Sequence, residues 1–160
     1  MSTANKNLSQ TSLESNEFFQ SLSIGLVVSE WNPEVTFAMS EAAVTFLIQK
    51  GVPANQVLVQ TVPGSFELPL ASKWMAEQKN IHAVIAIGCV IQGETRHFDF
   101  ICEACANGIM QVGLQTNKPV IFGVLTTQNQ QQAIDRAGGK HGNKGIEAAE
   151  TALKMLLLQK

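Results

Sequence analysis

The sequence predicts a single α/β domain in which a four-stranded parallel sheet lies between two layers of helices. Four short apolar runs lack polar alternation, which is typical of strands buried on both faces. A segment with apolar residues at helical spacing follows each run. The length of 160 residues and the hydrophobic content of 45% suit one domain that buries most of its apolar surface.

The first expected strand covers residues 23–29 and leads directly into a helix. Asn32 as N-cap and Pro33 in the first helical position predict where this helix begins. Gly51 predicts where it ends, because glycine adopts the left-handed conformation that closes many helices.

The second expected strand covers residues 56–62, and a Pro-Gly-Ser turn then leads to a helix over 66–78. Pro69 is compatible with this helix because it falls in the first turn. We expect Trp74 and Met75 to lie in the core.

The longest apolar run, residues 83–91, predicts the third strand, and residues 97–117 predict the helix after it. The expected buried face of that helix consists of Ile101, Cys105, Ile109 and Val112. The turn between these two elements delivers free backbone amides, a hydroxyl, a guanidinium and an imidazole to one place.

The last quarter of the chain predicts a fourth strand over 119–125 and a short helix over 128–135, capped by Thr127. Residues 138–145 are expected to form a flexible glycine-rich loop before a final helix over 146–158. This loop lacks the G-x-x-x-x-G-K-[ST] order, and we find no GxGxxG dinucleotide motif in the chain.

Composition limits the partners of this protein. Residues 1–17 are polar and predict a tail, so the expected domain covers 18–160. The formal charge of −2, without runs of like charge, argues against a nucleic-acid partner. No apolar stretch reaches the roughly 18 residues of a membrane span, and the N-terminus lacks the apolar segment of a secretion signal. We therefore expect a cytoplasmic protein with no membrane partner.

The three cysteines, Cys89, Cys102 and Cys105, do not predict a disulfide framework. Cys102 and Cys105 form a CxxC pair inside an expected helix, without a second pair of ligands. We interpret all three as buried small hydrophobic residues and expect no metal site.

Four loops should meet at the carboxyl edge of the sheet, which is the usual ligand crevice of parallel α/β proteins. Trp31 and Phe66 suit the two faces of a planar ring, and the amides that open a helix suit a phosphate. His97 is the candidate general acid and base, because imidazole exchanges protons readily near neutral pH. The other candidate side chains on these loops are Asn32, Ser65, Glu67, Arg96, Arg136, Lys140 and Lys144.

These residues also have purely structural interpretations. Trp31 would cover the sheet edge, Asn32 would be only an N-cap, and Glu67 would be a first-turn acid favoured by the helix dipole. Phe66 and Phe122 belong to the core by default. A histidine at a helix start is more often a capping or surface residue than a catalyst.

Taken together, the loops resemble those of the 6,7-dimethyl-8-ribityllumazine synthase family, and the resemblance extends over residues 24–157. Residues 63–69 resemble the family's PG(A/S)(F/Y)E(I/L)P, and residues 88–99 resemble its GxVIxGxTxHFD. The remaining matches are residues 124–127 with VLT, 133–138 with AxxRAG and 142–145 with GNKG.

This resemblance implies a flavodoxin-like three-layer α/β/α sandwich that assembles into homopentamers, with active sites shared between adjacent subunits. A decamer and a sixty-subunit icosahedral capsid are the larger forms that it leaves open. Phe122, Arg136 and Lys140 would come from the neighbouring subunit. Riboflavin synthase is a candidate partner protein.

The resemblance also implies two substrates and the residues that bind them. Trp31, Asn32, Ser65, Phe66, Glu67, Val90, Ile91 and Lys144 would bind 5-amino-6-(D-ribitylamino)uracil. Gly93, Glu94, Thr95 and Arg136 would bind 3,4-dihydroxy-2-butanone 4-phosphate. His97 and Arg136 would be catalytic, and the reaction requires no metal or redox cofactor.

Two departures from the family pattern bear on this expectation. Gln92 stands where many relatives carry Arg or Lys, which removes a cation near the anion site. His141 interrupts the usual GTKAGNKG, although Lys140 is retained. Two other classes of function stay open at this point: a non-catalytic lumazine or flavin binder, and a purely structural shell protein.

Overall fold

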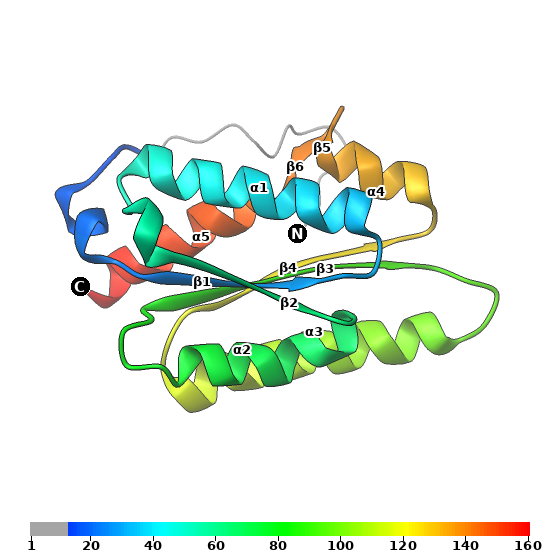
Figure 1. Ribbon diagram of the computed structural model, residues 1–160. Helices are drawn as coiled ribbons and strands as arrows, with labels where there is room; N and C mark the ends of the chain where they lie inside the picture. The colour runs from blue at the N-terminus through cyan, green and yellow to red at the C-terminus, as the bar shows by residue number, and fades with distance from the viewer. Residues whose placement is uncertain (1–12) are drawn as a thin grey trace.

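The computed structural model describes residues 13–160 and confirms the predicted parallel sheet between two helical layers (Figure 1). The strand order is β2-β1-β3-β4. Helices α1, α4 and α5 cover one face of the sheet, and α2 and α3 cover the other (Figure 1). The strands and helices are β1 (Ile24–Ser29), α1 (Pro33–Lys50), β2 (Val57–Val62), α2 (Leu68–Ala76), β3 (Ala83–Ile91), α3 (His97–Thr116), β4 (Val120–Thr127), α4 (Gln130–Arg136), β5 (Ala137–Gly139), β6 (Gly142–Asn143) and α5 (Lys144–Gln159).

The central strands β1 and β3 are apolar throughout because both of their faces are covered. Leu26 and Ile85 point into the core under α1 and α5, whereas Val27 and Val84 point into the core over α2 and α3. All six residues of β1 and the first seven of β3 are buried. This two-sided burial explains the absence of polar alternation in the sequence.

The boundaries of α1 were predicted correctly, but the role of Asn32 was not. Pro33 opens the helix, and Gly51 closes it with a φ of 111°. Asn32 precedes the helix in a left-handed conformation, with a φ of 57°, and its side chain makes no capping hydrogen bond. Its Nδ2 instead donates to the carbonyl oxygen of Cys89 on β3, at 2.9 Å.

Helix α2 is shorter than predicted, because residues Ser65–Glu67 form a turn of 3-10 helix before it. Met75 is buried, as expected, and packs on β1 where Gly25 leaves room for its side chain. The prediction that Trp74 lies in the core is wrong, since 62% of its surface is exposed.

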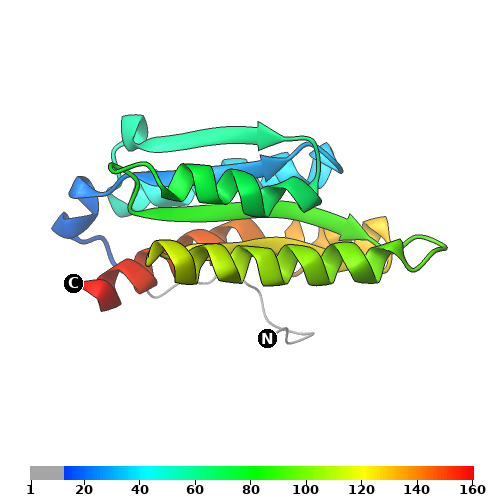
Figure 2. The same ribbon diagram turned by 90° about the horizontal axis from the view of Figure 1, so that it is seen from below.

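Helix α3 buries Cys105, Ile109 and Val112 as predicted, whereas Ile101 is only half-buried. The turn that joins β3 to α3 projects beyond the carboxyl ends of the strands (Figure 2). Ile101 lies one turn into the helix and faces the cavity described below. Its partial exposure therefore reflects a concave surface at this end of the molecule.

The segment between β4 and α5 differs most from prediction. Thr127 ends β4, and Asn129 caps α4 by accepting from the backbone nitrogen of Gln132 at 3.0 Å. Residues 138–145 do not form a flexible loop, because β5 and β6 pair as an antiparallel hairpin. Helix α5 begins at Lys144, two residues earlier than predicted, and Asn143 caps it.

The predicted polar tail falls mostly on residues 1–12, which lie outside the described residues. Its described end contributes to the core, since Leu13 packs against the cluster that contains the fully buried Phe19. A 3-10 turn, Glu17–Ser21, connects this segment to β1. Within the described part of the chain, no helix combines the length and apolarity needed to cross a membrane.

Candidate active site

A cavity of about 700 Å³ opens at the carboxyl edge of the sheet, at the position predicted for a ligand crevice. Three loops line it: those that follow β1, β2 and β3. Its lining residues are Trp31, Asn32, Gly64, Ser65, Phe66, Glu67, Cys89, Val90, Ile91, His97 and Ile101.

Two aromatic side chains in the wall of this cavity are unusually exposed. Trp31 is 71% exposed and Phe66 is 59% exposed, so the default placement of Phe66 in the core is wrong. Gly64 allows Trp31 to lie close to the loop, since a Cβ there would come within 3.2 Å of the indole. Exposed aromatic rings at the mouth of a concave site suit stacking against a planar ligand.

The polar groups of the cavity differ in whether they already have a hydrogen-bond partner within the chain. Asn32 is held by its hydrogen bond to Cys89, which fixes the loop after β1 against β3. The Ser65 hydroxyl is buried and has no hydrogen-bond partner among residues 13–160. Glu67 is exposed at the rim. This set offers hydrogen bonds to a polar ligand without rearrangement of the backbone.

The turn from β3 to α3 places His97 in the lining of the cavity. The His97 backbone nitrogen donates to the Thr95 hydroxyl at 3.4 Å, and His97 is exposed, as are residues 92–96. Gly93 leaves open space, since a Cβ there would meet no atom within 4 Å. The first turn of a 20-residue helix therefore presents backbone amides next to an imidazole.

The fourth expected loop does not join this cavity within one copy of the chain. Phe122 and Lys144 line a separate groove of about 740 Å³, which runs along β4 between α3 and α5. Arg136 and Lys140 line neither this groove nor the cavity. The segment after β4 leaves the sheet at the same carboxyl edge, since β4 is parallel to β3, but it does not line this cavity within the single chain. Phe122 is 37% exposed and so is not a core residue either.

Sequence reasoning missed two carboxylates that hold the lysines of this fourth loop. Asp135 lies 3.0 Å from the Lys140 ammonium, and Glu147 lies 2.8 Å from the Lys144 ammonium. The second pair has the i,i+3 spacing of neighbours on a helix, a signal visible in the sequence once the helix start is known. The first pair depends on the hairpin and has no comparable local signal.

The buried cysteines near the site have unreactive thiols. Cys89 and Cys105 are buried free thiols, as predicted, whereas Cys102 is half-buried. Burial raises the pKa of Cys89 to about 11 and, with a smaller effect of Cys102, that of Cys105 to about 12. These thiols therefore stay protonated at neutral pH and are poor nucleophiles.

The fold and the cavity define a class: a parallel α/β protein whose sheet edge suits a planar polar ligand and a neighbouring anion. Comparison with known sequences gives the particular family. The family described as 6,7-dimethyl-8-ribityllumazine synthase matches residues 21–160. A protein of this name from Cytophaga hutchinsonii is 58% identical to this chain over 156 residues, which cover 98% of both chains. Another from Porphyromonas gingivalis is 51% identical to this chain over 160 residues, which cover 100% of this chain and 99% of the relative. A Flavobacterium johnsoniae protein of this name is 50% identical over 99% of this chain and 84% of its own length. The chain belongs to the 6,7-dimethyl-8-ribityllumazine synthase family.

Proposed function

We propose that this protein is a transferase that condenses 5-amino-6-(D-ribitylamino)uracil with 3,4-dihydroxy-2-butanone 4-phosphate. The products are 6,7-dimethyl-8-ribityllumazine, phosphate and water, in the penultimate step of riboflavin biosynthesis. Membership of the family supports this reaction. The structural observation that carries it is the single cavity that combines exposed aromatic rings with His97.

The pyrimidine substrate is proposed to occupy the described cavity. Trp31 would stack on its ring, and the backbone of Val90 and Ile91 would bind the ring edge. The ribityl hydroxyls would bind Asn32, Ser65, Phe66 and Glu67. The unpartnered Ser65 hydroxyl supports this assignment, because a buried polar group without a partner is costly unless a ligand satisfies it.

The phosphate of the second substrate is proposed to bind at the β3–α3 turn. Gly93, Glu94 and Thr95 would contribute backbone amides at the helix N-terminus, where the helix dipole favours an anion. Arg136 would contribute its guanidinium, which matches phosphate geometry. The open space at Gly93 supports a close approach of the phosphate to the backbone.

In the proposed reaction, the 5-amino group attacks the ketone and water leaves, which gives an imine. Phosphate then leaves by β-elimination, and the ribitylamino nitrogen closes the ring with loss of a second water. Each step moves protons, and His97 is proposed to transfer them; its position in the lining of the cavity supports this role. Binding two reactive substrates side by side supplies a large part of the acceleration.

We also propose that the site is completed by a second copy of the chain in a pentamer-based homo-oligomer. The neighbouring copy would supply Phe122, Arg136 and Lys140, and also Lys144, because Lys144 lines the same groove as Phe122. Exposed apolar side chains on several helices support assembly. Residues 18–160 would form the catalytic domain and residues 1–17 a tail, in a protein that acts in the cytoplasm.

The substitution His97→Ala separates an enzyme from a binder. We expect the wild-type protein to form fluorescent lumazine well above the uncatalysed background, and the variant to lose roughly 10²-fold in kcat. Binding of the pyrimidine substrate, followed by quenching of Trp31 fluorescence, should be retained. His141→Ala is the matched control and should behave as wild type. Unchanged turnover in His97→Ala would remove His97 from the mechanism, and binding without any turnover in the wild type would favour the binder.

A further inference from the structure

A pocket of about 430 Å³ lies at the amino edge of the sheet, at the opposite end of the molecule from the β3–α3 turn (Figure 2). The segments that precede β1, β3 and β4 form this amino-edge pocket together with the end of α5. Its base is apolar, because Leu22, Ile81 and Leu156 are buried there. Its volume is typical of small-molecule sites, and it shares no lining residue with the cavity that contains Trp31 and His97.

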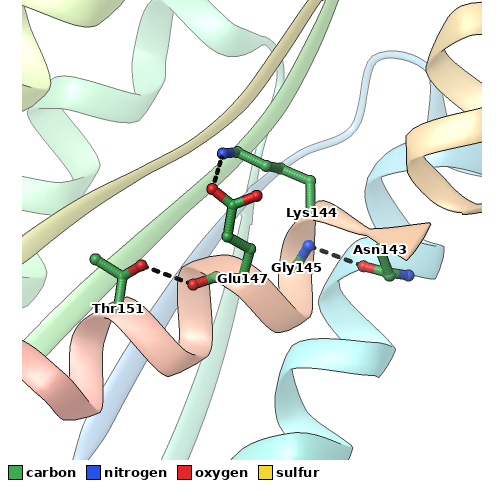
Figure 3. Close-up of polar contacts among 5 residues, drawn as sticks. All are labelled: Asn143, Lys144, Gly145, Glu147 and Thr151. Atoms are coloured by element: carbon green, nitrogen blue, oxygen red, sulfur yellow. Dashed lines mark hydrogen bonds and ion pairs between the residues drawn. The ribbon is translucent and has the colours of Figure 1, made fainter. Parts of the chain in front are cut away.

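The lysines of the amino-edge pocket have no acidic partner among the described residues. Four lysines elsewhere each lie beside a carboxylate, as Lys144 lies 2.8 Å from Glu147 (Figure 3). The other ion pairs are Lys73–Glu77, Lys140–Asp135 and Lys154–Glu150. The described lysines without an ion pair are Lys50, which donates to the Leu13 carbonyl, and the three that line the pocket, Lys79, Lys118 and Lys160. No aspartate or glutamate in residues 13–160 lines the pocket, so a protein with a formal charge of −2 concentrates positive charge there.

Helix capping explains only one of these three lysines. The Lys118 ammonium donates to the carbonyl oxygens of Ala76 and Gln78, at 2.7 and 2.9 Å, and so caps the end of α2. An ammonium has three donors, so one N–H of Lys118 is left for a ligand. Lys79 is exposed and makes no side-chain hydrogen bond within the described chain. The Lys160 ammonium lies over the ring of Phe18, 5.1 Å from its centre.

His82 adds a donor whose ring is held in place. Its Nδ1 accepts from the Ser23 backbone nitrogen at 2.9 Å, and the His82 backbone nitrogen donates to the Ser23 carbonyl oxygen at 2.9 Å. Because Nδ1 is an acceptor, the neutral ring carries its proton on Nε2. The pocket wall is also braced, since Gln159 donates to the Asn117 carbonyl oxygen at 3.4 Å and so joins α5 to the end of α3. The donors therefore line a pocket that exists before a ligand binds.

We propose that the amino-edge pocket binds a small organic phosphate. The phosphate would bind Lys79, Lys118 and the Nε2–H of His82, and the apolar part of the ligand would lie against the base. A phosphate dianion matches this set, because it offers several acceptor oxygens and enough charge for more than one ammonium. The site is separate from the carboxyl edge of the sheet, so this inference does not depend on the proposed reaction.

Equilibrium dialysis with phenyl phosphate tests the site. Arg136→Ala serves as the parent protein, because it lacks the guanidinium proposed to bind phosphate at the other end of the sheet. We expect the parent to bind phenyl phosphate, and Lys79→Gln in that parent to raise the Kd about tenfold, the usual scale of one charge-assisted hydrogen bond. Lys73→Gln is the matched control, because it removes the same charge from α2 outside the pocket and should leave the Kd unchanged.

Inorganic phosphate tests the apolar base of the pocket. It should bind the parent about tenfold more weakly than phenyl phosphate, because it has no apolar surface to bury. Equal affinities would overturn the choice of an organic phosphate. A parent that binds no phenyl phosphate, or equal Kd values for Lys79→Gln and Lys73→Gln, would overturn the amino-edge pocket as a phosphate site.

Discussion

The carboxylate of Asp135 is mostly buried and faces two donors. Gln131 donates to it at 3.0 Å, and the Lys140 ammonium lies 3.0 Å away. The hydrogen bond from Gln131, and next the contact with Lys140, lower the pKa of Asp135 below its ordinary value. A lowered pKa in the folded state means that folding favours the ionised form. The resulting stabilisation is present above about pH 4 and is lost as the pH falls through the folded-state pKa.

This pH dependence gives a prediction at the scale of one residue. Asp135→Asn should be less stable than wild type at about pH 6, and the difference should shrink as the pH falls below about 4, the ordinary pKa of an aspartate. Urea unfolding at a series of pH values measures it. Asp99→Asn is the control, because its contact with Arg96 is exposed and 3.9 Å long. A difference between Asp135→Asn and wild type that does not change with pH would show that Asp135 acts only by packing.

The start of α5 gives a prediction at the scale of one element. Gly145→Ala should destabilise the protein by about 2 kcal/mol or more, because the new methyl group would overlap the Met39 carbonyl and α5 would have to move away from α1. Gly113→Ala in α3 is the matched control, since its Cβ would have ordinary contacts at 3.5 Å and beyond. That change should be neutral or stabilise by up to about 1 kcal/mol. Thermal unfolding compares the two variants, and equal effects would mean that the close contact at Gly145 relaxes freely.

Elements with a local cause were predictable from the sequence. The helix from Pro33 to Gly51 and the strand β3 follow from a proline, a glycine and an apolar run, and each was predicted within a residue. The hairpin at 137–143 was missed because glycine-rich sequence is compatible with many conformations. Its pairing is selected by distant contacts, such as the hydrogen bond from Asn143 to Ala38.

The same distinction applies to the site. The cavity-lining loops were predicted because parallel strands bring their carboxyl ends together wherever they occur. The hydrogen-bond partner of the Asn32 side chain was not predicted, because Cys89 lies 57 positions away and the sequence indicates only a local helix cap. The separation of Phe122 and Lys144 from the cavity depends on which edge of the sheet β4 occupies, and local patterns do not fix strand order.

At the scale of the whole molecule, the two concave surfaces are complementary halves of one proposed site. The cavity contains the aromatic rings and His97, and the groove along β4 contains Phe122 and Lys144. The lining of the cavity includes no lysine or arginine, whereas the lining of the groove includes Lys118 and Lys144. The central claim is therefore an enzyme whose active site forms between copies of the chain.

Lumazine formation by mixed variants tests this claim most directly. Trp31→Ala damages the cavity and Arg136→Ala damages the proposed contribution of the neighbour, so each variant alone should be nearly inactive. If the two variants are unfolded together and refolded as a mixture, about a quarter of the sites should combine an intact cavity with an intact neighbour. We predict that the mixture regains up to about a quarter of the wild-type rate. A refolded, oligomeric mixture that stays as inactive as its components, beside an active wild type, would contradict the shared site.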